Sequence, residues 1–235
     1  MEFEPILILD NEFENVSDLI DLLSDSIRRR GHYGEFVFYC ESAEEASELM
    51  IERMKIKRGL SAMIVDNHLY GLDGEDFLRI VNGRVGYCIS KDRRHLNLDL
   101  NRFYNFEELY RVIGKNNAIS DFIEGVFSND YTLYLEFLKW WNNEERKPLQ
   151  IMLCGHPSYV DLAGLEDVFL IRKQEGCERE ILSFLEENGI FNHNEIESAY
   201  NNHPRFSAED KRKNEYNPCC HRIKKKKRRI RFDEL

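Results

Sequence analysis

Short apolar runs alternate with helical patterns along most of the chain. Three of these runs are PILILD (5–10), EFVFYC (35–40) and SAMIVD (61–66). Their length and their content of β-branched and aromatic residues predict strands. Between the first two runs, apolar residues recur at the spacing of one helical face, at Val16, Leu19, Ile20, Leu23 and Ile27.

The same alternation continues toward the C-terminus. Ser42 and Glu45 have the spacing of a capping box and predict a helix that ends near Gly59. LQIMLC (149–154) and VFLIRK (168–173) predict two more strands, followed by a helix that Gly189 ends. Strands that alternate with helices predict an α/β fold with a parallel sheet covered on both faces.

Residues 84–147 interrupt this alternation and are far longer than an ordinary loop. Three helical patterns, FEELYRVI, ISDFIEGVF and LYLEFLKWW, predict an inserted helical segment. It is rich in large apolar groups, which predict either a separately folded interaction surface or a cover over one edge of the sheet. These groups include Phe103, Tyr104, Phe106, Trp140 and Trp141.

Charge is distributed unevenly along the chain. Residues 211–235 carry 11 basic and 3 acidic side chains, a net charge of +8, whereas the whole chain has −10, so residues 1–210 carry −18. Periodicity fades from about residue 190. We therefore expect one domain over 1–189, including the insertion at 84–147, and a weakly structured tail over 190–235.

The basic run HRIKKKKRRIR (221–231) predicts nonspecific contact with nucleic acid, because clustered cations bind polyanions through counterion release. Two alternatives stay open: the run folds back on the acidic part of the chain, or it is only a solvated tail. The side chains expected to contact nucleic acid are Lys224, Lys225, Lys226, Lys227, Arg228, Arg229 and Arg231.

No apolar run approaches the roughly 20 residues that span a bilayer, so no membrane partner is expected. The acidic start lacks the features of a signal peptide. The six cysteines have no framework spacing, which is typical of a reducing cytoplasm. Cys219 and Cys220 are adjacent and lack the usual spacing of zinc ligands, so free thiols are expected there.

Polar side chains follow the predicted strands where their carboxyl ends meet. Asp10-Asn11-Glu12 ends the first strand, Asp66 the third, Cys154-Gly155 the fourth and Lys173 the fifth. Ligands of doubly wound sheets bind at this edge. Carboxylates there suit a divalent cation, and a lysine suits a phosphoryl group, so the pattern predicts a site for both.

These segments resemble the receiver domain of bacterial two-component response regulators. The resemblance rests on ILILDNE, MIVDNHLYGLDG, IMLCG and LIRKQ, and covers roughly 4–83 and 148–189. It implies a flavodoxin-like doubly wound (βα)5 parallel sheet of receiver type, with the helical insertion between helix 3 and strand 4. The phospho-accepting aspartate of the family falls on Asp66, and its Asp-Gly pair falls on Asp73-Gly74.

The resemblance implies a switch in a phosphorelay rather than a turnover enzyme. A sensor histidine kinase or phosphotransfer protein would be its partner, and Asp66 would form an aspartyl phosphate. Lys173, Cys154 and Gly155 would contact the phosphoryl group. A weakly bound Mg²⁺ would be held by Asp10, Asn11, Glu12, Asp66 and the carbonyl of His68.

Departures from the family pattern leave an alternative open. The second acid of the metal-binding pair is Asn11, the switch hydroxyl is Cys154, and the aromatic switch position is Leu170. These changes favour a phosphorylation-independent pseudo-receiver scaffold that binds partners through the insertion and the basic tail. Two other interpretations are a purely structural Asp66 and a haloacid-dehalogenase nucleophile at Asp10, whose companion motifs are missing.

Overall fold

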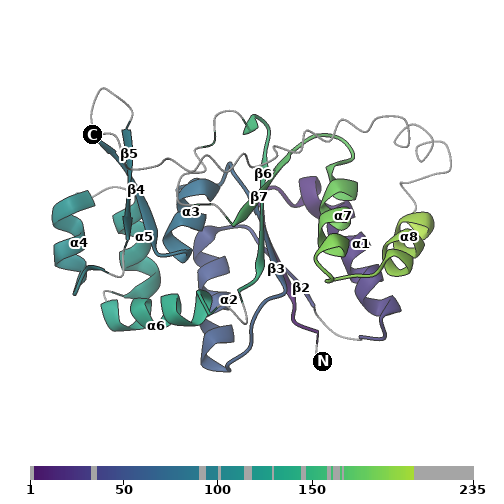
Figure 1. The fold of residues 1–235 in the computed structure, drawn as a ribbon, viewed down its shortest axis with the longest axis horizontal. Coiled ribbons are helices and arrows are strands. Elements are labelled where there is room, and N and C mark those ends of the chain that lie inside the picture. Colours follow the sequence, from purple (N-terminus) through teal and green to yellow (C-terminus); the bar gives the residue numbers. More distant parts are fainter. Residues whose placement is uncertain are drawn as a thin grey trace, which may run out of the picture.

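A five-stranded parallel sheet forms the centre of the computed structural model (Figure 1). The structure describes residues 3–32, 36–89, 94–99, 102–113, 118–128, 130–143, 147–157, 160, 165 and 167–203. The strand order is β2-β1-β3-β6-β7, which is compatible with a flavodoxin-like fold and confirms the predicted α/β class. Its strands are β1 (Ile6–Leu9), β2 (Val37–Cys40), β3 (Ala62–Asp66), β6 (Leu149–Cys154) and β7 (Val168–Arg172).

Helices cover both faces of the sheet because alternate strand residues point to opposite sides. Ile6 and Ile8 of β1 pack with one layer, and Leu7 and Leu9 pack with the other. The first layer holds α1 (Phe13–Arg29), α7 (Cys177–Glu187) and α8 (His193–Asn202), and the second holds α2 (Ala43–Lys55) and α3 (Gly74–Val81) (Figure 1).

The described residues of the insertion between α3 and β6 form three helices, where helical patterns were expected, and also a two-stranded hairpin that those patterns did not predict. β4 and β5 pair antiparallel over six residues each. The elements are β4 (Arg84–Ile89), β5 (Arg94–Asp99), α4 (Phe106–Ile113), α5 (Ala118–Phe127) and α6 (Tyr131–Trp141).

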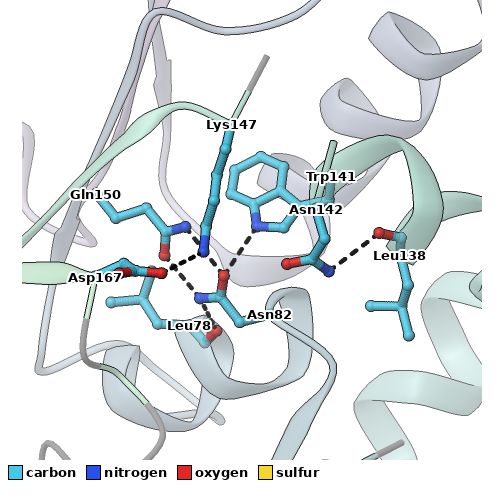
Figure 2. Close-up of polar contacts among 8 residues, drawn as sticks. All are labelled: Leu78, Asn82, Leu138, Trp141, Asn142, Lys147, Gln150 and Asp167. Atoms are coloured by element: carbon cyan, nitrogen blue, oxygen red, sulfur yellow. Dashed lines mark hydrogen bonds and ion pairs between the residues drawn. The ribbon is translucent and has the colours of Figure 1, made fainter. Parts of the chain in front are cut away.

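The insertion shares its hydrophobic core with the α2–α3 side of the sheet. The hydroxyl of Tyr134 donates to the carbonyl of Ile80 at 2.8 Å, and the indole of Trp141 donates to Asn82 Oδ1 at 3.3 Å. Asn82 and Gln150 also exchange two amide hydrogen bonds, so α3, α6 and β6 are joined at one point (Figure 2). The insertion therefore packs against α2 and the end of α3 and shares one hydrophobic core with them.

Residues 190–202 differ from the weakly structured tail that we expected from residue 190. They include α8 (His193–Asn202), which begins with a capping box between Asn192 and Glu195 and packs on α1. Arg30, the C-cap residue of α1, donates to the carbonyl of Ile190 at 2.7 Å and forms an ion pair with Glu195. The tail from residue 204 lies outside the described residues, and so does its basic run, including Lys224, Lys225, Lys226, Lys227, Arg228, Arg229 and Arg231.

Within the part of the chain that the structure describes, no helix combines the length and the apolar character needed to cross a membrane.

Candidate functional site

Three strands bring Asp10, Asp66 and Lys173 together at the carboxyl edge of the sheet. β1 and β3 are neighbours, so the residues at their ends lie side by side. β7 is separated from β3 by β6, and the long side chain of Lys173 spans that distance. The backbone N–H of Lys173 donates to the carbonyl of Cys154 at 2.9 Å, which continues the pairing of β6 with β7.

The ammonium group of Lys173 contacts both carboxylates. Its Nζ lies 2.8 Å from Asp10 Oδ2, with a hydrogen bond, and 3.1 Å from Asp66 Oδ1, as an ion pair without hydrogen-bond geometry. Asp10 is 0% exposed and Asp66 is 3% exposed. Two buried like charges are unfavourable without a cation, so Lys173 compensates for both.

Burial is the main cause that raises the pKa of Asp66 above its ordinary value. The charge of Lys173 and the backbone N–H of His68 oppose this increase, whereas the negative charge of Asp10 adds to it. The pKa of Lys173 is also raised, because its contacts with Asp10 and Asp66 outweigh the lowering effect of burial. The lysine therefore stays protonated, and burial favours the neutral form of Asp66.

The loop after β3 brings the start of α3 against Asp66. The N–H of Gly74 donates to the carbonyl of Asn67 at 3.0 Å, and the N–H of Asn67 donates to that of Leu153 at 2.8 Å. A Cβ atom at Gly74 would overlap with the backbone carbonyl oxygen of Asp66. Glycine is thus required by this close approach.

The other predicted metal ligands are arranged less closely. Glu12 donates its backbone N–H to Asp10 Oδ1 at 2.9 Å, but its exposed carboxylate accepts a hydrogen bond from Asn15 at 2.7 Å. Asn11 is partly exposed. His68 is exposed, and the contact described for it is made by its backbone N–H, not by the predicted carbonyl.

The two residues expected at the end of β6 also lie at this edge. Cys154 is a buried free thiol, and a Cβ at Gly155 would meet open space. Cys154 contributes its backbone carbonyl to Lys173. We find no described hydrogen bond in which its thiol replaces the expected hydroxyl.

The oxygen donors suit a weak divalent site rather than a strong one. No group of three or more His, Cys, Asp or Glu side chains suited to a metal is present among the described residues. Asp10 and Asp66 supply two carboxylates, and Asn11 can add a neutral amide oxygen. The buried Oδ1 of Asn67 has no hydrogen-bond partner, so one more hard oxygen lies next to Asp66 in the chain.

Two polar residues of this edge were not predicted as site residues. Asn67 directly follows Asp66, and this position was the feature of the sequence that could have identified it. Tyr39 lies near the end of β2, and burial together with Glu41 and Asp10 raises its pKa to about 12. Its ring packs edge-on against Phe13, with the ring centres 5.2 Å apart.

Comparison with known proteins does not suggest a function for the chain, so a functional assignment depends on the arrangement of Asp10, Asp66 and Lys173. No protein-family model matches the chain. A search of curated proteins found no significantly similar sequence.

Proposed function

We propose that the chain is a receiver-like signalling module that accepts a phosphoryl group on Asp66. The observation that carries this proposal is the cluster of Asp10, Asp66 and Lys173 at the carboxyl edge of a parallel sheet, with one ammonium within 3.1 Å of both carboxylates. The glycine-dependent approach of α3 to the backbone of Asp66 also supports it, because this contact fixes the position of Asp66 at the end of β3.

In the proposed reaction, a carboxylate oxygen of Asp66 attacks the phosphorus of a phosphohistidine or a small phosphodonor. The new P–O bond forms as the bond from phosphorus to the donor nitrogen or oxygen breaks, and the leaving group keeps that electron pair and takes a proton from solvent. Lys173 then pairs with the phosphoryl oxygens in place of the free carboxylate. Asp10 keeps the ammonium oriented through its 2.8 Å hydrogen bond.

A divalent cation such as Mg²⁺ would offset the charge that develops on the phosphoryl oxygens. Asp10 and Asp66 would hold it, assisted by Asn11 or Glu12 and the carbonyl of His68. Because Asn11 is neutral, we expect weak binding. The donor would be a sensor histidine kinase or a phosphotransfer protein, and the module would act as a switch rather than as a turnover enzyme.

A second candidate function is a phosphorylation-independent scaffold with the same fold. It is favoured by the 3% exposure of Asp66, by the buried thiol of Cys154 at the expected hydroxyl position, and by the neutral Asn11. Such a scaffold would bind partners through the insertion and the basic tail.

Labelling with a small phosphodonor separates the two candidates. Full-length protein is incubated with acetyl phosphate and Mg²⁺, and its intact mass is measured. The signalling proposal predicts one added phosphoryl group that is stable in acid and labile in base, and no addition to the matched Asp66→Asn variant. Absence of labelling in the folded wild-type protein favours the scaffold.

A further inference from the structure

An exposed aromatic ring lies among carboxylates where β2 ends beside the first turn of α1. Phe13, the first residue of α1, is 48% exposed, and its ring meets that of Tyr39 edge-on with the ring centres 5.2 Å apart. Burial is the main cause that raises the pKa of Tyr39. Four nearby carboxylates add to this increase, and they belong to Glu41, Asp10, Glu14 and Glu45.

We call Phe13, Tyr39, Glu14, Glu41 and Glu45 the Phe13 patch. Its negative charge has no counterpart in the surrounding sequence, since residues 1–27 and 31–52 contain no lysine or arginine. Glu14 and Glu41 are exposed and form no ion pair with any described residue. The carboxylate of Glu45 accepts a hydrogen bond from the backbone N–H of Glu41 at 2.9 Å, which is a neutral partner.

The negative surface continues from the patch along α2. Glu45, Glu48 and Glu52 are exposed and follow one another at helical spacing, so they lie along one side of the helix. Like charges at this spacing destabilise a helix. A cationic segment bound along this side would relieve the repulsion.

The last described residue at the C-terminal end lies close to the patch. His203 follows α8, and its Nε2 lies 3.9 Å from Asp21 Oδ2 of α1. Asp21 lies eight residues after Phe13 on the same helix, about 12 Å along the helix axis. Residues 204–220 connect His203 to the basic run at 221–231, and a chain of this length reaches up to about 60 Å. The connection is therefore long enough for the run to reach the patch.

We propose that the basic run of this chain docks on the Phe13 patch. The run carries eight lysine and arginine side chains in eleven residues, whereas the patch offers carboxylates and an exposed ring. A guanidinium or ammonium placed over the ring of Phe13 makes a cation–π contact, and the carboxylates around it pair with the charge. Tethering keeps the patch at a high effective concentration, so the run meets it more often than a separate polyanion.

Docking gives the tail a regulatory role. A docked run is not available to nucleic acid, so the two contacts exclude each other. Asp10 borders the patch, because its charge also acts on Tyr39, and the docked cations would lie beside the Asp66 cluster. Docking itself does not depend on phosphorylation of Asp66, so its test is separate from that of the proposed function.

Zero-length cross-linking of the full-length protein tests the proposal. A carbodiimide couples a lysine to a carboxylate that touches it, and tandem mass spectrometry locates the link. The sample is a mixture of ¹⁵N-labelled and unlabelled protein, which separates links within one copy from links between copies. We expect the lysines at 224–227 to be linked to Glu14, Glu41 and Glu45 within single copies, with a yield that falls as salt is added.

Replacement of the ring tests the patch while every carboxylate stays in place. Phe13→Ala should weaken docking about two- to fivefold, the factor that one exposed cation–π contact contributes. At the salt concentration where the wild-type yield of links is half maximal, this yield should fall about one and a half- to threefold. Tyr104→Ala is the matched control, because Tyr104 is 86% exposed and lies in the insertion. Its yield should equal that of wild type.

Three results would overturn the proposal. Links spread equally over carboxylates of the insertion, such as Glu136 and Asp121, would show that the run has no preferred site. Links found only between differently labelled copies would assign the patch to a second copy of the chain. No links from the run, or a yield that Phe13→Ala leaves unchanged, would remove the patch as its docking site.

Discussion

Replacing Lys173 by methionine removes the only cation that contacts Asp10 and Asp66 among the described residues, while keeping an unbranched side chain of similar size. Charges at 2.8 and 3.1 Å attract each other by about 5 to 6 kcal/mol each at an effective dielectric constant of about 20. Desolvation of the ions offsets part of this attraction. Removal of one partner from a buried ion pair costs about 3 to 5 kcal/mol, and the 25% exposure of Lys173 favours the lower end.

We therefore expect Lys173→Met to lose about 3 kcal/mol of unfolding free energy at pH 7. With a urea dependence of about 2 to 3 kcal/mol per molar, the unfolding midpoint should fall by about 1 to 1.5 M. Lys147→Met is the matched control, since its ion pair with Asp167 is also 2.8 Å long but Asp167 is 73% exposed. This variant should lose no more than about 1 kcal/mol.

The pH dependence of the unfolding free energy tests the same prediction independently. The pKa of Asp66 is raised in the folded protein, so its contribution to stability is present below its unfolded pKa and is lost as pH rises through the folded value. In Lys173→Met the pKa of Asp66 should rise further, because the cation that lowers it is absent. The loss of stability between acidic and neutral pH should therefore be larger in the variant. The stability gap between wild type and Lys173→Met should therefore narrow as pH falls from 7 toward 4.

The pKa of Lys173 is also raised in the folded protein, and its contribution to stability is lost only at high pH. Its contribution is fully present below its ordinary pKa of 10.5 and is lost only as pH rises through the raised value. Equal losses in Lys173→Met and Lys147→Met at pH 7, or a gap that widens on acidification, would refute the assignment of Lys173 as the compensating charge.

Three further changes test other parts of the structure. Asn11→Asp should tighten Mn²⁺ or Mg²⁺ binding in a calorimetric titration because it adds a charged oxygen near Asp10; unchanged affinity would remove Asn11 from the metal site. Gly74→Ala should cost about 1 to 3 kcal/mol in urea unfolding, since its Cβ meets the backbone of Asp66, and wild-type stability would contradict that close approach. Deletion of residues 90–144 with a short linker should give an insoluble or poorly cooperative protein, because these residues share the hydrophobic core; a cooperatively folding product would show that the core does not need them.

The sheet was predictable because each strand is a short apolar run bounded by turn residues. The hairpin β4–β5 was missed, although RHLNLDL alternates polar and apolar residues, because the surrounding helical patterns dominate the insertion. α8 was missed because its apolar positions are few. The spacing of Asn192 and Glu195 was the signal that could have located its start.

The three residues of the cluster could be predicted from the sequence, but the contacts between them could not. Strand-end positions identified Asp10, Asp66 and Lys173, because parallel strands deliver their carboxyl ends to one edge. The contact of one ammonium with both carboxylates depends on the strand order and on Lys173 reaching across β6, which only the tertiary structure specifies. The hydrogen bond that Glu12 accepts from Asn15 is likewise a result of side-chain packing.

The central claim is that Asp66 is the acceptor, and the position of the phosphoryl group tests it most directly. Wild-type protein treated with acetyl phosphate and Mg²⁺ is reduced with borohydride, which converts an acyl phosphate to an alcohol, and is then mapped by tandem mass spectrometry. The proposal predicts conversion at Asp66 and at no other carboxylate. Conversion at Asp10 or Glu12 with an unmodified Asp66, or no conversion in the folded protein, would contradict it.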